Sequence, residues 1–397
     1  RVGRGHAAWR YRRETIDGIE VWRCPLWVPR EPLPAKRILH LLSFALSSFL
    51  PTLWHAATWR PDAVWAVEPT SFAAPTALLA ARIGGAAACL HVQDLELEAA
   101  GALRMLAASS LYRRAVSAYG WLLRRFDLVS TISERMRRGL AAHGVAPERL
   151  CLFPNWVDTG AIMPLESASR LRRKLGFGDD QVVVLYAGNM GEKQGLEGLA
   201  PVAERLAERP DIQFVLCGAG AVRPRLERLL DGRPNVTLLP LQPRERLNDL
   251  LNLADIHILP QRAQAASFAL PSKLGGILAS GRPVVAQTDG GELARAARVG
   301  GLAVAPDDPG SMVDAILALC ADAERRRRLG RAGRRFAETY LDRERIIARY
   351  VADLVAHLPE AAPRSRWRQL RSRVAARLPD PAVIGYAGPP AELNGRR

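Results

Sequence analysis

Short apolar runs alternate with helix-like segments over residues 181–286, and this alternation constrains the fold more than any other feature. The strand-like runs are QVVVLYAG (181–188), DIQFVLCG (211–218), NVTLLP (235–240), DIHILP (255–260) and PVVA (283–286). Segments such as LEGLAPVAERLAER (196–209) lie between them and carry apolar residues on one helical stripe. Strands and helices that alternate in this rhythm predict a parallel sheet covered by helices.

The same rhythm occurs in the first half of the chain. DAVWAV (62–67), AAACLHV (86–92) and DLVSTIS (127–133) have the composition of strands, and Ser133 is suited to cap a helix over 133–144. Residues 160–180 are polar and indicate a linker. Two such arrays joined by a linker predict an α/β fold with two Rossmann-like domains that face a cleft.

The domain boundaries follow from this pattern. We expect an N-terminal domain over residues 1–160 and a second domain over 161–345, followed by a helix over 346–360. Residues 361–397 are rich in Arg, Pro and Ala with weak periodicity, which indicates a basic, largely disordered tail.

The charge and the cysteines narrow the class of protein. The net charge is +16 among 397 residues. It indicates either an acidic partner, such as an anionic membrane or a phosphorylated substrate, or the Arg usage of a GC-rich genome. The five Cys are scattered and form no CxxC or Cys/His cluster, so neither a metal site nor a disulfide framework is expected.

Two segments are candidates for contact with a membrane. Residues 37–54 are strongly apolar but interrupted by Pro51, which favours a buried or interfacial helix over a membrane span. Residues 101–126 mix large apolar side chains with five Arg, a pattern that fits either an anionic lipid surface or a solvated helix face.

Two turns in the second half are candidates for binding an anion. In YAGNMGEKQG a strand ends at Gly188, and a tight loop with Asn189, Gly191 and Lys193 follows. Glycines let the backbone approach a ligand and Lys193 can neutralise a phosphate, although a lone Lys before a helix is usually surface charge. The turn at Gly218 is a weaker signal, because it lacks the full dinucleotide fingerprint.

The stretch FALPSKLGGILASGRPVVA (268–286) is the third candidate. Pro271 is suited to the first turn of a helix, which places Ser272 and Lys273 at the helix start. A cation there opposes the helix dipole, and a bound diphosphate would repair the mismatch. Small residues such as Gly276 would let this helix approach a ligand or the sheet closely.

His91 and Asp94 follow a predicted strand in the first half, in LHVQDLELEA. A His at the carboxyl end of a strand can contact a substrate in a cleft. A lone His is more often satisfied inside the structure, so both interpretations stay open.

A series of motifs, in order along the chain, resembles one family. They are WRPDAVWAV (59–67), HVQD (91–94), STISERM (130–136), FPNWVDT (153–159), YAGNMGEKQGLE (186–197) and PSKLGGILASGRPVVA (271–286). Over about residues 10–345 the chain resembles the GT-B glycosyltransferases of family 4, and it looks closest to bacterial exopolysaccharide members of the colanic-acid type. The motifs together are specific for this superfamily but not for a donor or an acceptor.

The resemblance implies a retaining transfer of a sugar from a nucleotide-diphosphate donor to a lipid-linked or saccharide acceptor, without a metal. Lys193 would then stabilise the leaving diphosphate, and Gly188, Asn189, Gly191, Gly218, Ser272, Lys273 and Gly276 would bind the donor. His91 would contact the sugar, and Asp94 would lie on the acceptor side. The enzyme would act on the inner face of the plasma membrane, peripherally and without nucleic acid.

The chain departs from the family pattern in three places. A pair of Glu found in many relatives falls on Phe268 and Gly276, and the usual Arg of the diphosphate loop is Asn189. The first strand and Gly-rich loop of the N-terminal domain are expected before residue 10 but do not occur in this sequence. The alternative function is therefore a non-catalytic sugar-nucleotide-binding or scaffold module, and we expect the chain to be a fragment that is inactive or less stable.

Overall fold

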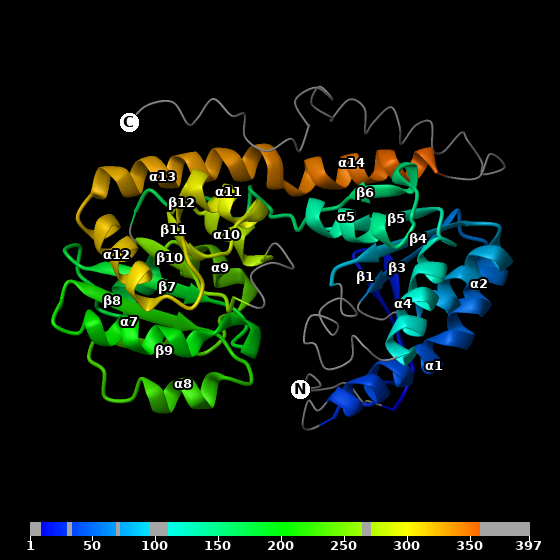
Figure 1. Ribbon diagram of the computed structural model, residues 1–397, viewed down its shortest axis with the longest axis horizontal. Coiled ribbons are helices and arrows are strands. Elements are labelled where there is room, and N and C mark those ends of the chain that lie inside the picture. Colours follow the sequence, from blue (N-terminus) through cyan, green and yellow to red (C-terminus); the bar gives the residue numbers. More distant parts are fainter. Residues whose placement is uncertain are drawn as a thin grey trace. The chain divides into compact units, whose positions relative to one another are not determined.

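The structure, a computed structural model, describes residues 9–29, 34–68, 72–94, 110–167, 169–263 and 271–357. These residues form two compact units (Figure 1). The first unit contains the described residues up to Phe153 and those from Tyr350 onward, and the second contains those from Pro154 to Arg349. The division thus falls before the predicted boundary at 160, and the predicted tail over 361–397 lies outside the described residues.

A parallel sheet forms the centre of the first unit, with strand order β3-β4-β5-β6. Its strands are β3 (Ala63–Glu68), β4 (Ala87–Val92), β5 (Leu128–Thr131) and β6 (Leu150–Leu152). The helices of this unit are α1 (Pro34–Trp59), α2 (Ala74–Gly84), α4 (Ser110–Leu123) and α5 (Glu134–Ala142). The helix predicted over 133–144 is confirmed, and its cap Ser133 accepts a hydrogen bond from the Met136 backbone N–H at 3.2 Å.

The second unit contains a six-stranded parallel sheet with strand order β12-β11-β10-β7-β8-β9. The strands are β7 (Val182–Ala187), β8 (Ile212–Cys217), β9 (Val236–Leu239), β10 (Ile256–Leu259), β11 (Val284–Gln287) and β12 (Gly301–Val304). The first five confirm the predicted strands. Every pairing is parallel, so the alternation of strands and helices in the sequence becomes a doubly wound layer structure.

Helices accompany this sheet throughout its sequence. They are α6 (Arg170–Lys174), α7 (Leu199–Arg205), α8 (Arg223–Leu229), α9 (Leu247–Leu251), α10 (Lys273–Ala279), α11 (Gly291–Gly300), α12 (Pro309–Cys320), α13 (Ala323–Phe336) and α14 (Arg343–Ala356). Helix α14 takes the place of the predicted helix over 346–360 and begins earlier. Its residues up to Arg349 belong to the second unit, and those from Tyr350 belong to the first.

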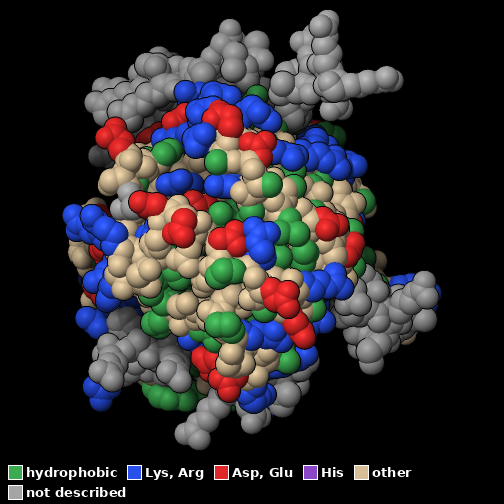
Figure 2. Space-filling model, turned by 90° about the vertical axis from the view of Figure 1, so that its left-hand side faces the viewer, with side chains coloured by type: hydrophobic (Ala, Val, Ile, Leu, Met, Phe, Trp, Pro, Cys, Tyr) green, Lys and Arg blue, Asp and Glu red, His purple; other side chains and the backbone are tan. Residues whose placement is uncertain are grey.

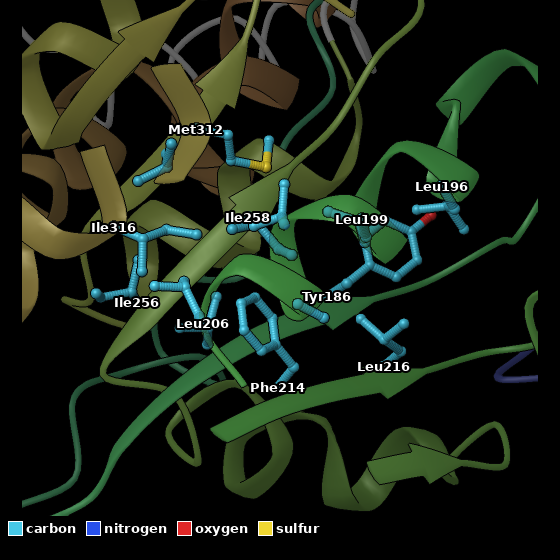
Figure 3. Close-up of a cluster of buried hydrophobic side chains, with 14 of the residues drawn as sticks. Tyr186, Leu196, Leu199, Leu206, Phe214, Leu216, Ile256, Ile258, Met312 and Ile316 are labelled. Atoms are coloured by element: carbon cyan, nitrogen blue, oxygen red, sulfur yellow. The ribbon is translucent and has the colours of Figure 1, made fainter. Parts of the chain in front are cut away.

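The main core of the second unit joins strands β7, β8 and β10 to helices α7 and α12. Figure 3 shows Tyr186 and Phe214 at its centre, with Ile258, Met312 and Ile316 packed around them. Strands buried on both faces read as continuous apolar runs, which explains why the sequence revealed them. The ring of Tyr186 is part of this core, while its hydroxyl donates to the Asn189 carbonyl just beyond the carboxyl end of β7.

Residues 160–180 are not a simple linker, and this prediction was wrong. Arg172 of α6 is buried, and its guanidinium donates to the Asp255 carboxylate at 2.7 Å and to the Gly178 and Gln181 carbonyls. Asp255 also accepts from the Val183 backbone N–H at the start of β7. The segment is therefore packed into the second unit by a buried ion pair.

The charged helix α13 packs closely against its neighbours through glycines. A Cβ atom on Gly330 would lie 2.0 Å from the Gly281 carbonyl oxygen, and one on Gly333 would lie 3.2 Å from the Gly300 Cα. Arg334 of the same helix donates to the Ala279 carbonyl at the end of α10. Helix α13 thus holds α10 in place.

A β-hairpin precedes α1 in the sequence. It consists of β1 (Arg12–Ile16) and β2 (Ile19–Arg23), joined by Asp17 and Gly18 with φ angles of 52° and 80°. Positive φ at both central residues is typical of a tight hairpin turn, and Asp-Gly is the sequence signal for it.

The hairpin is attached to α1 at the point where Pro51 interrupts the helix. Pro51 has no backbone N–H, so the Ser47 carbonyl one turn earlier loses its helical partner. The Tyr11 hydroxyl donates to this carbonyl at 2.8 Å. The proline therefore creates an acceptor that binds the preceding segment.

Candidate functional site

The strand order of the second unit places a binding site at the ends of β7 and β10. The chain runs from β7 to β8 and β9 on one side, then returns to β10, β11 and β12 on the other. Loops that leave β7 and β10 at their carboxyl ends therefore diverge, and ligands of doubly wound sheets bind in the crevice so formed.

A cavity of about 910 Å³ lies at this position. Its lining residues are Trp156, Val157, Asp158, Ala161, Ile162, Ala187, Gly188, Cys217, Leu241, Gln242, Pro243, Arg244, Glu245, Leu247, Asn248, Leu250, Leu251, His257, Ser272, Lys273, Gly276 and Ile277. Sites for small molecules commonly have 300–1,000 Å³, so this cavity has room for a nucleotide. Of the predicted donor residues, Gly188, Ser272, Lys273 and Gly276 line it.

Lys273 supplies a cation inside this pocket. Its Nζ donates to the Tyr186 hydroxyl and, at 3.3 Å, to the Asn189 carbonyl, and it lies 4.2 Å from the centroid of the Tyr186 ring. Burial lowers the pKa of the Lys273 ammonium to about 8. An amine held this way carries a positive charge at neutral pH that is poorly compensated by solvent.

Gly188 makes room for the Lys273 side chain. A Cβ atom on Gly188 would lie 2.3 Å from the Lys273 Cε, and the φ of 139° is one that other residues rarely adopt. The glycine at the end of β7 is thus required by a side chain that comes from α10. This pairing joins two of the three predicted anion-binding segments.

The other loop glycines have structural reasons of their own. A Cβ on Gly218 would lie 1.9 Å from the Gly188 carbonyl oxygen. Gly191 accommodates a turn in which its N–H donates to the Gln194 side chain at 3.0 Å. Gly218, Gly191 and Asn189 are not among the lining residues of the pocket, and their predicted donor contacts stay predictions.

Lys193 lies in the same loop but outside the pocket lining. It belongs to the 3₁₀ turn Glu192–Gln194 and its side chain is exposed. The structure therefore separates the two predicted lysines, with Lys273 inside the pocket and Lys193 on the surface of the neighbouring loop.

Polar residues that the sequence analysis missed also line the pocket. Arg244 and Glu245 follow β9 and begin the turn that leads into α9. Asp158 accepts from Arg343 at 2.6 Å and from the Gly160 and Ala161 backbone N–H groups. In the sequence, only one feature indicated Arg244 and Glu245: they follow a strand of the same parallel sheet. Turns that follow the strands of such a sheet lie at its carboxyl edge, where the crevice is.

The pocket wall next to Lys273 is formed by Gly276 and His257. A Cβ on Gly276 would have one neighbouring atom within 4 Å, the Leu251 Cδ1 at 3.3 Å. His257 is buried, its Nε2 lies 3.0 Å from the Leu251 carbonyl, and burial lowers its pKa to about 3. The wall is thus uncharged where many relatives are expected to carry a carboxylate, and Phe268 lies outside the described residues.

His91 is buried in the first unit, with 2% of its surface exposed. Its ring stacks on Trp65 at 5.8 Å and contacts the edge of Phe153 at 5.2 Å, while Nδ1 lies 3.0 Å from the Ser130 hydroxyl. Burial lowers the His91 pKa to about 4. This placement supports a satisfied structural His and does not present the ring to a ligand.

Asp94 follows β4 and is only partly buried, as a residue at the carboxyl end of a strand would be. Among the described residues no group of three or more His, Cys, Asp or Glu could hold a metal ion. The roles predicted for His91 and Asp94 in contacting substrate stay predictions.

We expect His91→Phe to fold and to lose part of the acid sensitivity of the wild type. An unfolded His takes up a proton near pH 6.5, but the buried His91 does so only near pH 4, so a falling pH favours unfolding between these values. Between these pH values His91 makes the free energy of unfolding of the wild type fall by roughly 1.4 kcal/mol for each unit that the pH decreases. This contribution should be absent in the variant. Urea titrations at pH 7, 6 and 5 measure this difference.

Activity of the same variant separates the two roles of His91. A structural residue predicts transfer rates within a fewfold of the wild type, because Phe suits the aromatic cluster. A loss of a hundredfold or more with normal stability would instead support the predicted contact with the sugar.

Two family models match the chain. A model described as "Glycosyl transferases group 1" matches residues 181–322, and one described as "Glycosyl transferase 4-like domain" matches residues 2–156. The chain is 37% identical over 364 residues to the colanic acid biosynthesis glycosyl transferase WcaI of Escherichia coli K12. This alignment covers 89% of the chain and 88% of the relative.

A more distant relative and solved structures agree with this assignment. A GDP-mannose-dependent monoacylated alpha-(1-6)-phosphatidylinositol monomannoside mannosyltransferase of Corynebacterium glutamicum is 30% identical over 221 residues, which are 53% of this chain and 58% of that protein. Sucrose-phosphate synthase of Thermosynechococcus elongatus has a similar fold, with a TM-score of 0.64 and 20% identity over 91% of this chain and 85% of its own. Anabaena HepE in complex with UDP and glucose has a TM-score of 0.59 and 18% identity over 77% of this chain and 81% of its own. The chain therefore belongs to the glycosyl transferase family that the two models describe, and it is a glycosyltransferase with the GT-B fold.

Proposed function

We propose that this enzyme transfers a sugar from a nucleotide-diphosphate donor to a lipid-linked or saccharide acceptor, with retention at the anomeric carbon, in the synthesis of a bacterial exopolysaccharide. The observation that carries the proposal is the pocket of the second unit, where Lys273 lies at the point where the strand order reverses. The similarity to WcaI, a colanic acid biosynthesis enzyme by name, supports the exopolysaccharide role.

Lys273 is the residue that we assign to the leaving diphosphate. Its ammonium is fixed by Tyr186 and Asn189 before any ligand binds, so little reorganisation is needed when negative charge develops on the diphosphate. The low polarity that depresses its pKa also strengthens its attraction to an anion. We propose that this cation acts without a metal.

The nearby residues complete the donor site in this proposal. Ser272 offers a hydroxyl beside Lys273, and the glycine at 188 keeps the end of β7 open to the ligand. Lys193 lies in the loop that begins at Gly188, and it adds a second cation if this loop bends over the donor. Leu241 and Pro243 give the pocket apolar surface on which a nucleobase could pack.

One relative suggests what the acceptor is. The relative from Corynebacterium glutamicum acts, by its name, on a phosphatidylinositol mannoside, which is a lipid. We propose that the acceptor is bound by the first unit, with Asp94 near it, and that the enzyme works peripherally on the inner face of the plasma membrane.

Sugar transfer to a synthetic lipid diphosphate sugar tests the proposal. We expect one nucleotide sugar among the UDP and GDP forms of glucose, galactose, mannose and fucose to be consumed, with the same anomeric configuration in donor and product by NMR. The rate should not change when EDTA is added. Inversion at the anomeric carbon or loss of activity with the chelator would overturn the corresponding part of the mechanism.

Lys193→Ala tests the second cation, with Lys174→Ala as the matched control. Lys174 is an exposed lysine of α6 in the same unit and does not line the pocket. Loss of one charge-assisted contact is expected to reduce kcat/KM by about ten- to a hundredfold at Lys193 and to have no effect at Lys174. Equal rates in both variants would remove Lys193 from the site.

A further inference from the structure

Helix α1 has one face packed inside the first unit. Ala45, Ser48 and Ala56 lie on this face and are buried, and the helix packs against α2. Small side chains at spacings of three and eight residues let the two helices approach closely. Figure 1 shows α1 and α2 side by side at the edge of this unit.

The opposite face of α1 is apolar and exposed. Leu39, Leu46, Leu50 and Trp54 follow one another at spacings of seven, four and four residues, which places them on one stripe. Leu46, Leu50 and Trp54 expose 76%, 71% and 67% of their surface. A soluble monomer rarely exposes a continuous apolar stripe of this length, so the stripe indicates a contact surface.

The surroundings of the stripe are basic and aromatic. Lys36 lies at the start of the helix, and Trp59 and Arg60 lie at its end. The segment before the hairpin is attached to α1 through Tyr11 and carries the exposed Trp9 two residues earlier. Residues 9–29 and 34–60 contain seven basic and three acidic residues. The basic ones are Arg10, Arg12, Arg13, Arg23, Lys36, Arg37 and Arg60, and the acidic ones are Glu14, Asp17 and Glu20.

This combination fits an anionic lipid surface. Trp is favoured at the boundary between water and the hydrocarbon core, and basic residues near an apolar face bind anionic headgroups. On the face shown in Figure 2, by contrast, Arg and Lys are interspersed with Asp and Glu, which does not favour an anionic membrane. Charge and apolar surface therefore coincide at α1.

The packing of α1 indicates whether this helix lies on a membrane or crosses it. Residues 38–59 are long and apolar enough to cross a bilayer. However, α2, against which α1 packs, also packs on β3 and β4, so a spanning α1 would have to leave α2 or carry the edge of this sheet into the lipid. Backbone groups of an open sheet cannot be satisfied there.

We propose that α1 lies in the plane of an anionic membrane surface, with Leu39, Leu46, Leu50 and Trp54 inserted among the acyl chains and its small-residue face kept on α2. The inference rests on the proposed function in one respect: an enzyme held at this surface would have access to a lipid-linked acceptor. Binding of nucleotide by the second unit does not depend on it.

Flotation with vesicles tests this surface. The wild type is expected to bind vesicles of phosphatidylglycerol and phosphatidylcholine at least tenfold better than phosphatidylcholine alone, and to be released by high salt or carbonate. The double variant Leu46→Gln, Leu50→Gln leaves the charge unchanged and should lose at least tenfold in binding. Leu229→Gln, an exposed leucine of α8 in the second unit, is the control and should bind as the wild type does.

Each other outcome overturns the inference. Retention after carbonate extraction would mean that α1 spans the bilayer. A dimer in light scattering that the double variant abolishes, without vesicle binding by the wild type, would assign the stripe to a second copy. Calorimetric titration of the double variant with nucleotide separates this inference from the proposed function, because normal nucleotide affinity with lost vesicle binding affects only the former.

Discussion

Lys273→Met is expected to lose about a hundredfold in affinity for the donor nucleotide while becoming more stable. Met has a similar length, retains contact with the Tyr186 ring and leaves the Tyr186 hydroxyl bonded to the Asn189 carbonyl. The variant removes the charge that we assign to the diphosphate, and charge-assisted hydrogen bonds contribute about 1.5–3 kcal/mol.

The gain in stability follows from the pKa of Lys273. The free amine titrates near 10.5 but the buried one titrates near 8, so the folded state holds fewer protons between these values and stability rises with pH there. At pH 7 the buried ammonium therefore opposes folding. We expect Lys273→Met to raise the free energy of unfolding by roughly 2 kcal/mol at pH 7 and by less at pH 10.

Calorimetry at pH 7 and pH 9 and urea titration measure both effects. Nucleotide affinity of the wild type should fall by up to about tenfold between pH 7 and pH 9, because the Lys273 amine of the free pocket loses its proton over this range. Lys174→Met should change neither quantity. Normal nucleotide binding by Lys273→Met would remove Lys273 from the diphosphate site, and a loss of stability would mean that its hydrogen bonds outweigh its burial.

Gly330→Ala is expected to destabilise the second unit although Ala favours helices. Gly330 lies in the middle of α13, where the replacement alone would contribute about 1 kcal/mol of stability. Its Cβ would lie 2.0 Å from the Gly281 carbonyl oxygen, and backbone atoms cannot give way as the end of a side chain can. Overpacking costs about 1–3 kcal/mol, and a clash with the backbone at 2.0 Å belongs at the upper end of this range. After the gain from helix propensity is subtracted, we expect a net loss of about 2 kcal/mol.

Thermal unfolding of matched variants checks this prediction. A net loss of 2 kcal/mol corresponds to a decrease in Tm of roughly 4–8 °C for a unit of this size. Gly198→Ala is the control, because its Cβ would have no neighbour within 4 Å and its φ is −63°. An unchanged Tm for Gly330→Ala would show that α13 shifts away from Gly281 at little cost.

The strands were predictable because parallel strands of this fold are buried on both faces. Val182–Ala187 is apolar along its whole length, and Ile212–Cys217 is apolar except at Gln213. The role of α6 was not predictable, because Arg172 depends on Asp255, which lies 83 residues later in the sequence. A charged segment appears as a linker until its distant partner is known.

The sequence predicted pocket residues at positions where the residue type does not suit the local secondary structure. Lys273 at the start of a helix and Gly188 at the end of a strand both indicated a ligand, and the structure brings them together at the pocket. His91 was less informative, because every residue of β4 is buried and alternation along the strand cannot tell which face meets a ligand. Arg244 carried no local conflict, so only the position of β9 in the sheet connects it to the site.

The split membership of α14 sets the order in which the protein can mature on the ribosome. Tyr350 packs on Phe153 at 4.3 Å and joins Ala87, Cys89 and Leu128 in the core of the first unit. That unit, begun first, is completed by residues that are translated almost 200 positions after Phe153. At about 5–20 residues per second the nascent first unit waits roughly 10–40 s for its last core residue. During this time its apolar edge is open to chaperones.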